Sequence, residues 1–284
     1  MNPAKRARRA SADGERGVSG RLIVCPTPIG NLDDVTLRVL AALREANIIA
    51  CEDTRHTRKL LERHAVEPKG LLSYHEHNER RRAGELVKRI QEGKTVALVS
   101  DAGTPIVSDP GHILVRACLD AALEVEVLPG PASPVTALVA SGLPADRWCF
   151  AGFLPRRKGE LQRTLERSSE TLVAFESPNR LPATLALLAE IDPARSVAVC
   201  RELTKLHEEV ARGSAAEVAA RFADRARGEV VIVIGPAAKT ASEHRLASAL
   251  DAVERLVEAG ARRRAAASVV GSLTGLPANR LYRA

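Results

Sequence analysis

The sequence predicts an α/β fold with two α/β units in series, followed by a small helical tail. Short apolar runs alternate with helix-like stretches from Leu22 onward, which is typical of a mainly parallel sheet with helices between its strands. A second series of the same kind starts at Trp148, just after the break Ser141-Gly142-Leu143-Pro144. A chain of 284 residues also exceeds the usual size of one compact domain.

The first unit is expected to span residues 21–144 and to alternate five strands with five helices. Its expected strands are residues 22–25, 47–51, 71–74, 96–100 and 125–128. Its expected helices are residues 34–46, 54–64, 79–92, 111–122 and 133–141. Before this unit, residues 1–20 are rich in Arg, Ala, Gly and Ser without periodicity, which predicts a disordered basic leader.

The second unit is expected to span residues 145–238. Its expected strands are residues 148–153, 171–176, 196–201, 207–212 and 229–234, with helices near 158–169, 179–190 and 214–225. Residues 239–284 are rich in Ala and Arg and helical in pattern, with breaks at Gly260 and at Thr274-Gly275-Leu276-Pro277. They predict a small helical tail of the helix-turn-helix type.

The net charge of +7, from 42 basic and 35 acidic residues, is concentrated at the two ends. Residues 1–21 and 245–284 each carry +4, which leaves −1 for the body of the chain. Contacts with phosphate are therefore expected from the ends and from local clusters such as Arg80-Arg81-Arg82 and Arg156-Arg157-Lys158. Ordinary solvated helix faces explain the same clusters equally well.

Three classes of protein are disfavoured by composition. No apolar run reaches roughly 18 residues and none follows the Arg-rich start, so no membrane span or secretory signal is indicated and a cytoplasmic location is expected. The five cysteines lack C-x-x-C spacing and are expected to be buried thiols. On a strand, His75 and His77 would share a face, but no further matched ligands lie nearby, so no metal is expected.

The loop 100–111, Ser-Asp-Ala-Gly-Thr-Pro-Ile-Val-Ser-Asp-Pro-Gly, is the strongest indication of a ligand site. It follows the apolar run 96–99, and open α/β sheets bind ligands at the carboxyl ends of their strands. Its glycines and prolines shape the backbone, while its Ser, Thr and Asp side chains offer hydroxyls and carboxylates. The chain has no G-x-G-x-x-G or P-loop, including after the first strand at 26–32, so a ligand without phosphate is favoured.

Polar clusters also follow other predicted strands. They are residues 52–57, 75–79 and 128–134 in the first unit, and residues 175–180 and 201–205 in the second. Helix capping explains part of this pattern, since Asp53 or Thr54 can cap one helix and Ser133 another. Because successive strands would deliver these clusters to the same edge, a cleft shared by both units is favoured.

Six ordered motifs resemble the ribosomal RNA small subunit methyltransferase I family, in the tetrapyrrole-methylase-like superfamily. They are Thr27–Leu32, Glu52–Thr57, Ser73–Glu79, the loop 100–111, Leu128–Pro131 and Phe175–Arg180. The resemblance covers about residues 22–235, with a weaker similarity at Leu273–Tyr282. It implies two α/β domains of the tetrapyrrole methylase type (class III methyltransferase), with a cofactor cleft between them and the helical tail as an appendage.

The resemblance also implies an activity. Members of the family transfer a methyl group from S-adenosylmethionine to the ribose 2′-hydroxyl of a cytidine in the decoding region of 16S rRNA. The expected partner is therefore 16S rRNA in the assembled small ribosomal subunit, and the expected state is a homodimer. With 2% aromatic residues the chain has few stacking platforms, so RNA recognition is expected to rely on backbone charge and on particle shape.

The same resemblance implies cofactor residues. The superfamily's Gly-Asp-Pro loop falls on Gly103-Thr104-Pro105, where Thr104 replaces the acid and Asp101 is near enough to substitute for it. Exposed carbonyls and hydroxyls suit a positively charged sulfonium. The residues expected to contact the cofactor are Pro28, Asp101, Ala102, Gly103, Thr104, Pro105, Ile106, Ser108, Pro131, Ser133, Phe175, Glu176 and Thr204.

Methyl transfer to a hydroxyl is an in-line displacement, in which alignment supplies much of the rate and a general base removes the proton. The candidate bases are Glu76, His75 and Asp53, with Lys205 as an electrostatic partner. Three alternatives stay open: a corrin- or sirohaem-type methylase, a non-catalytic ribosome-binding protein, and an aspartic protease. The last is suggested only by Asp101-Ala102-Gly103-Thr104, and its chemistry needs paired carboxylates in a β-barrel setting.

Overall fold

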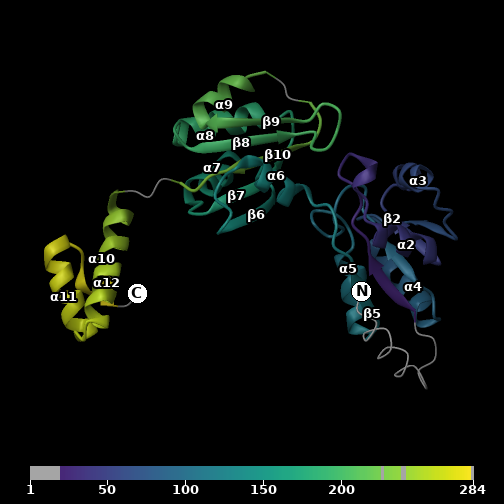
Figure 1. Cartoon of the computed structure of the whole chain (residues 1–284), viewed down its shortest axis with the longest axis horizontal. Coiled ribbons are helices and arrows are strands. Elements are labelled where there is room, and N and C mark those ends of the chain that lie inside the picture. The colour runs from purple at the N-terminus through teal and green to yellow at the C-terminus, as the bar shows by residue number, and fades with distance from the viewer. Residues whose placement is uncertain (1–19, 225–226, 238–240, 283–284) are drawn as a thin grey trace.

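The computed structural model describes residues 20–224, 227–237 and 241–282, which form two α/β units and a group of three helices (Figure 1). The predicted leader lies outside the described residues, except for Gly20. Within the described ranges, no helix is both long and apolar enough to cross a membrane.

The first unit is built on a fully parallel five-stranded sheet, as its sequence pattern predicts. The strands follow the order β3-β2-β4-β1-β5. They are β1 (Arg21–Val24), β2 (Ile48–Cys51), β3 (Leu71–Ser73), β4 (Val96–Leu98) and β5 (Glu124–Val127). Because all five run the same way, the loops after them emerge at one edge.

Helices cover both faces of this sheet. They are η1 (Leu32–Asp34), α2 (Leu37–Glu45), α3 (Thr54–Arg63), α4 (Glu79–Gln91), α5 (His112–Asp120) and α6 (Ser133–Ser141). Leu43 of α2 and Leu60 of α3 belong to the core on one face, and Leu86 of α4 and Leu114 of α5 to the core on the other. Helix α6 differs, because its buried Ala137 and Leu138 pack against the second sheet.

The second unit contains a mixed sheet in the order β6-β7-β10-β8-β9. Its strands are β6 (Trp148–Phe153), β7 (Thr171–Glu176), β8 (Ser196–Arg201), β9 (Glu209–Ser214) and β10 (Val230–Ile234). Strand β6 pairs with β7 in parallel, whereas β10 runs antiparallel to both β7 and β8. The start of β10 therefore lies at the same edge as the ends of β7 and β8.

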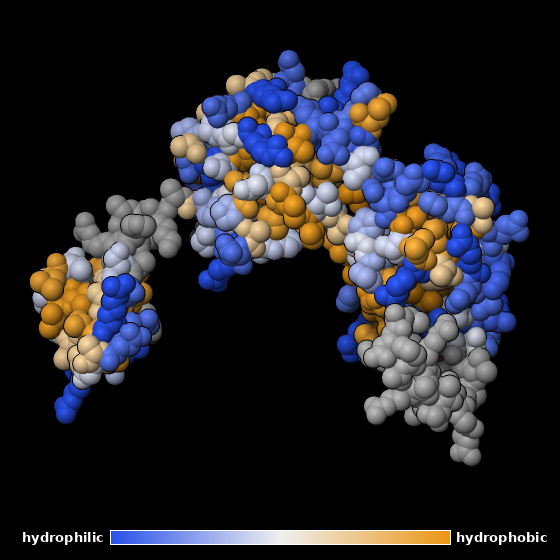
Figure 2. Space-filling view, in the orientation of Figure 1, coloured by the Kyte–Doolittle hydropathy of each residue, from blue (hydrophilic) through white to orange (hydrophobic). Residues whose placement is uncertain are grey.

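One face of the second sheet is covered by α7 (Lys158–Arg167), α8 (Leu181–Ile191) and α9 (Ala215–Arg221). The predicted tail forms α10 (Ala241–Glu258), α11 (Arg263–Thr274) and α12 (Ala278–Tyr282), with turns at Gly260 and Gly275. These three helices share a small core around Val253, Val270 and Leu281. Figure 2 shows the tail with an apolar side beside a hydrophilic ridge.

Candidate active site

A cavity of about 450 Å³ lies where the carboxyl edge of the first sheet meets the second unit. The first unit supplies residues that follow β1, β4 and β5, and the second unit supplies the ends of β6, β7 and β8 with the start of β10. The lining residues are Ile29, 102–104, 107–109 and 132–134 from the first unit, and Phe153, 175–178, Cys200, Leu203 and 228–231 from the second.

The loop 100–111 is held in place by hydrogen bonds to the loops after β1 and β5. Thr27 and Gly103 exchange both backbone hydrogen bonds, at 2.8 and 3.1 Å. The Ser100 hydroxyl donates to the Gly103 carbonyl at 3.1 Å, and the Thr104 hydroxyl donates to the Pro131 carbonyl at 3.0 Å. Three strand-end loops are thus fixed together as one wall of the cavity.

Two loops at the site hold non-glycine residues in the left-handed region. Ile106 and Ser108 have φ of 79° and 67°, and Glu202 and Thr204 have φ of 52° and 66°. Each such residue costs of the order of 1–3 kcal/mol, so the surrounding contacts must hold it there. Strained backbone of this kind is common at ligand sites, and here it borders the cavity from both units.

The second unit contributes a buried, hydrogen-bonded carboxylate and a pair of aromatic rings. Glu176 has a fully buried carboxylate that accepts from Ser177 N at 2.7 Å and from the Thr184 hydroxyl at 2.6 Å, with the Arg180 guanidinium 3.4 Å away. The Phe153 and Phe175 rings meet edge to face with centroids 5.3 Å apart. Glu176 therefore fixes the end of β7, while the phenyl rings form an apolar wall.

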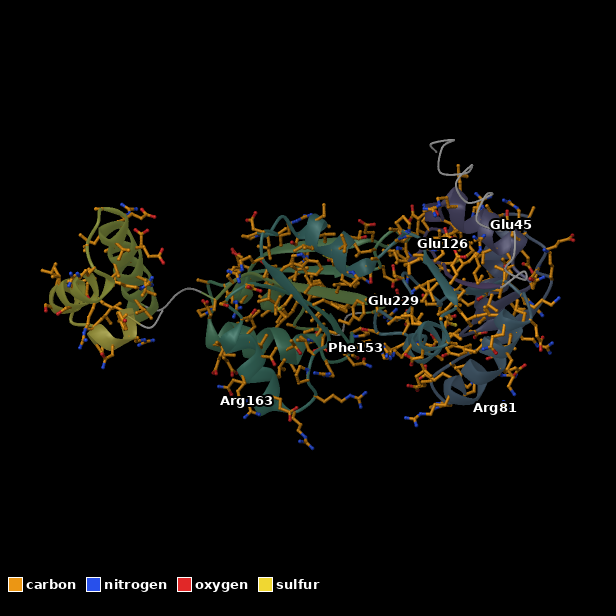
Figure 3. The ribbon with its side chains drawn as sticks, turned by 90° about the horizontal axis from the view of Figure 1, so that it is seen from below. Glu45, Arg81, Glu126, Phe153, Arg163 and Glu229 are labelled. Carbon is orange, nitrogen blue, oxygen red and sulfur yellow. The ribbon has the colours of Figure 1, made fainter. Side chains whose placement is uncertain are left out.

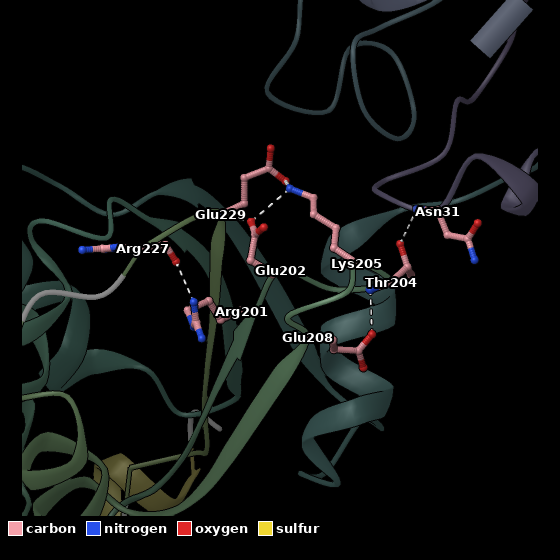
Figure 4. Close-up of polar contacts among 8 residues, drawn as sticks. All are labelled: Asn31, Arg201, Glu202, Thr204, Lys205, Glu208, Arg227 and Glu229. Atoms are coloured by element: carbon pink, nitrogen blue, oxygen red, sulfur yellow. Dashed lines mark hydrogen bonds and ion pairs between the residues drawn. The ribbon is translucent and has the colours of Figure 1, made fainter. Parts of the chain in front are cut away.

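The loop after β8 joins the two units, as Figure 4 shows. Asn31 N donates to the Thr204 hydroxyl at 2.9 Å, and Lys205 Nζ lies 3.0 Å from both Glu202 and Glu229. Burial lowers the pKa of Lys205, but its bonds to Glu229 and Glu202 outweigh this and raise the pKa overall.

Gly30 lies directly against this loop. A Cβ atom at that position would come within 2.5 Å of Lys205 Cγ and within 2.9 Å of the Leu203 carbonyl oxygen. Because the carbonyl belongs to the backbone and cannot rotate away, only glycine permits the close approach of the two units here.

The charged side chains that line the cavity are all acidic. They are Asp109, Glu176 and Glu229, and no lysine, arginine or histidine occurs among the described lining residues. Burial raises the pKa of Asp109 to about 6, and repulsion from Glu52 and Asp101 adds to this, while the nearby Ser100 hydroxyl opposes it. Arg180 and Lys205, which lie outside the lining, pair with Glu176 and Glu229, so Asp109 is the lining acid without an ion-pair partner among the described residues. With one such acid and no cation in its lining, the cavity favours a cationic ligand over a phosphate.

Seven of the thirteen residues expected to contact the cofactor line this cavity. They are Ala102, Gly103, Thr104, Ser108, Ser133, Phe175 and Glu176. Pro28, Asp101, Pro105, Ile106, Pro131 and Thr204 do not line it, but belong to the same loops. The Asp101 carboxylate accepts a hydrogen bond from Asp53 N at 3.0 Å. Ser133 begins α6 without capping it, because Ala132 occupies the N-cap position.

The four expected catalytic residues lie away from the lining. Asp53 caps α3 by accepting from Arg55 N at 2.8 Å, and the Arg55 side chain lowers the pKa of Asp53 to about 2. His75 and Glu76 follow β3 in a turn, with His75 Nε2 3.0 Å from Asn78 Nδ2. Lys205 is engaged by its two ion pairs.

His75 and His77 lie in the turn after β3, which ends at Ser73, so they do not share the face of a strand. Their rings instead meet edge to face in the turn, with centroids 5.8 Å apart. Among the described residues, no three His, Cys, Asp or Glu side chains gather as metal ligands do. Four of the five cysteines are buried and free as predicted, while Cys149 is exposed.

Two cavity residues escaped the sequence analysis for different reasons. Asp109 lies within the loop 100–111, but no motif separates it from Asp101 in sequence. Glu229 precedes β10, and only the antiparallel direction of that strand brings it to the site. For Asp109, an acid between Ser108 and Pro110 is the only sequence signal.

Comparisons with known proteins place the chain in a family. Residues 21–219 match the family model for Tetrapyrrole (Corrin/Porphyrin) Methylases. The ribosomal RNA small subunit methyltransferase I of Micromonospora olivasterospora is 42% identical, with 96% of this chain and 90% of the relative covered. The protein of the same name from Escherichia coli O157:H7 is 40% identical, with 96% of each chain covered.

Solved structures show the same fold at lower identity. The methyltransferase CobJ has a TM-score of 0.59 at 24% identity, covering 78% of this chain and 96% of its own. A uroporphyrin-III C-methyl transferase from Thermus thermophilus, complexed with S-adenyl homocysteine, has a TM-score of 0.53 at 22% identity, covering 76% and 97%. The chain belongs to the tetrapyrrole methylase family and, within it, to the ribosomal RNA small subunit methyltransferase I group.

Proposed function

We propose that this enzyme transfers a methyl group from S-adenosylmethionine to the ribose 2′-hydroxyl of a cytidine in 16S rRNA. The observation that carries this proposal is the cavity between the units, whose charged lining residues are Asp109, Glu176 and Glu229. S-adenosylmethionine, when bound, supplies a methyl group on a positively charged sulfur. An acidic cavity with apolar walls fits that cation and its adenosine part.

In this proposal, some residues of the chain contact the cofactor and others hold the loops that do so. The hydroxyls and carbonyls of the loop 100–111 face the cofactor, and Ile29, Phe175, Leu203 and Val231 supply apolar surface. The seven expected residues in the lining make direct contacts in this proposal. The six others hold their loops in shape, as the hydrogen bonds from the Thr104 hydroxyl to the Pro131 carbonyl and from Asp53 N to the Asp101 carboxylate illustrate.

Asp109 is the residue placed best to accept the proton of the acceptor hydroxyl. It lines the cavity and is half-buried, and its pKa of about 6 leaves it ionised yet basic near neutral pH. Glu176 is saturated by hydrogen bonds, and Glu229 is paired with Lys205. Glu76 and His75 remain candidates if the acceptor approaches from the β3 side, whereas the lowered pKa makes Asp53 a weak base.

The substrate proposal rests on the relatives, which are named as ribosomal RNA small subunit methyltransferases. We further propose that the assembled small subunit is the substrate, that catalysis takes place in the cytoplasm, and that two copies form a homodimer. Exposed Val127 of β5 with Val135 and Val139 of α6 offer apolar surface for such a dimer. We also propose domain boundaries near residues 20, 144 and 238.

Two measurements test the function together. Calorimetry should detect S-adenosylmethionine binding, and transfer of a labelled methyl group should occur to small subunits from cells that lack the enzyme. Fragment mass mapping should then place one methyl group on the ribose of a cytidine. Transfer to a tetrapyrrole but not to subunits would favour a corrin- or sirohaem-type methylase, and absent cofactor binding would favour a non-catalytic ribosome-binding protein.

A further inference from the structure

The rim of the cavity carries an exposed aromatic ring. Phe153, at the end of β6, lines the cavity and is 64% exposed. The chain has four Phe, two Tyr and one Trp, all within the described ranges, and only Phe153 and Tyr282 of the tail are exposed. In Figure 3, Phe153 and Glu229 lie on the side of the second unit that faces the first. An exposed phenyl ring at a cavity mouth offers a flat apolar face on which a planar group can stack.

A second hollow of about 330 Å³ lies in the same unit. It lies between α7 and α8, with Arg156, Lys158 and Arg180 among its lining residues and Glu190 as its one acidic group. Arg156 follows Phe153 by three positions, and Arg180 follows the cavity residue Pro178 by two. The cavity and this basic groove (Arg156, Lys158 and Arg180) are also linked directly, because Glu176 of the cavity accepts a hydrogen bond from Thr184 of the groove at 2.6 Å.

The cations of the basic groove differ in their pairing. Arg180 donates to the Leu154 carbonyl at 3.2 Å and to the Pro155 carbonyl at 2.6 Å, so it fixes the segment that presents Phe153. Arg156 and Lys158 are exposed and have no ion-pair partner in the described part of the chain, whereas the intervening Arg157 pairs with Glu160 at 3.5 Å. Two cations are thus left to meet an external anion.

We propose that single-stranded RNA beside the methylated nucleotide lies along this path, with a base stacked on Phe153 and its neighbouring phosphates against Arg156 and Lys158. This inference rests on the proposed function, because it assigns the surface that receives the RNA. A ribose hydroxyl can enter the cavity only if its nucleotide leaves the base stack, and an aromatic ring replaces the lost stacking. The groove then holds the strand through its backbone charge.

The test compares four variants of the full-length enzyme with unmethylated small subunits as the probe. Phe153→Ala should weaken subunit binding by about 10- to 100-fold, and Phe153→Trp should restore it, because stacking needs a flat ring rather than this particular one. The double variant Arg156→Ala/Lys158→Ala should lower the slope of log affinity against log salt by about 1.4, the value for two phosphates on a single strand. The charge-matched double variant Arg58→Ala/Lys59→Ala on α3 should leave both quantities unchanged.

Calorimetry with S-adenosylmethionine and sedimentation velocity complete the test. All four variants should sediment as the wild type does, and the groove variant and the α3 control should bind the cofactor as the wild type does. Phe153→Ala should lose less cofactor affinity than subunit affinity, because its ring also lines the cavity. If Phe153→Ala weakens cofactor binding as much as subunit binding, or changes the oligomeric state, the ring serves the cofactor or a second copy and the inference is overturned. An unchanged salt slope for the groove variant overturns it as well. If the wild type binds cofactor but neither binds nor methylates subunits, the proposed function itself has failed.

Discussion

The carboxyl edge of the first sheet has two halves that look alike in sequence and differ in structure. The loops after β4, β1 and β5 line the cavity, whereas the loops after β2 and β3 do not reach it. In the first half, Ile106 and Ser108 hold strained backbone and Asp109 has a raised pKa. In the second half the polar groups are used locally, as in the pairing of Glu76 with His77 at 3.6 Å on the exposed surface.

Strand order accounts for this difference. In the order β3-β2-β4-β1-β5, the strands β4, β1 and β5 are adjacent, and β2 and β3 occupy the opposite end of the edge. Glu52 at the end of β2 connects the halves, because its charge helps to raise the pKa of Asp109. The pKa of Glu52 is itself raised, by burial first and then by repulsion from Asp101 and Glu76. Polar residues at the end of a strand are thus not enough to assign a catalytic role. The position of the strand in the sheet determines whether its loop reaches the cavity.

The largest effect is expected from Asp109→Asn. Losing a general base typically costs 10²- to 10⁴-fold, so single-turnover methyl transfer should fall by about 10²- to 10³-fold with cofactor affinity changed far less. Glu76→Gln and His75→Ala, at the β3 end, should each cost under about tenfold on the same scale. Rapid-quench assays with small subunits measure all three. A large loss for Glu76→Gln with none for Asp109→Asn would place the base at the β3 end and contradict the assignment of catalysis to the first half.

A smaller effect is expected from Gly30→Ala, which pushes the β1 loop away from the second unit. The added Cβ would meet the Leu203 carbonyl at 2.9 Å, so the two walls of the cavity must separate. Misplacement of this size should lower the methyl-transfer rate by about 10- to 100-fold, with the fold retained by circular dichroism. Gly84→Ala in α4 is the matched control, because a Cβ there has no neighbour within 4 Å and alanine favours the helix. Equal rates in both variants would mean that the units need not meet this closely.

Glu52→Gln tests the electrostatic interaction between the two halves. Glu52 repels the ionised form of Asp109, so removing its charge should lower the pKa of Asp109 from about 6. The acid limb of the pH–rate profile should then move to lower pH by a few tenths to about one unit. Single-turnover rates between pH 5 and 8 measure the shift. An acid limb that stays in place would show that Asp109 does not control the profile.

The sequence predicted the alternating strands and helices of both units and the resemblance that matches the family. It also predicted the importance of the loop 100–111, because Gly and Pro beside hydroxyl residues form a pattern that is local in the sequence. It could not yield strand order, which long-range pairing such as Leu22 with Val96 determines. The antiparallel β10, which brings Glu229 to the site, and the packing of α6 on the second sheet depend on tertiary contacts of the same kind.

The smallest expected effect concerns stability, and it tests the raised pKa of Asp109 in the first half without any substrate. The folded-state pKa of Asp109 is raised from 3.8 to about 6, so the folded protein holds its proton more tightly than the unfolded chain does. Stability from this group is present below about pH 4 and is lost as pH rises through 6. Asp109→Asn removes that loss, so it should stabilise the fold near pH 7.5 by about 1 kcal/mol or less after solvent screening, and by only about a third as much at pH 4.5.

Thermal unfolding of the wild type and the asparagine variant at both pH values measures the difference, which should be about 2–4 °C or less at pH 7.5 when the two units unfold together. Asp120→Asn is the control, because that exposed carboxylate is paired with Arg116 at 2.8 Å and has no burial to relieve. A variant of Asp109 that loses both activity and stability would point to a purely structural role. A gain in stability with a loss of activity is what a carboxylate held for chemistry should give, since such groups are kept at a cost to the fold.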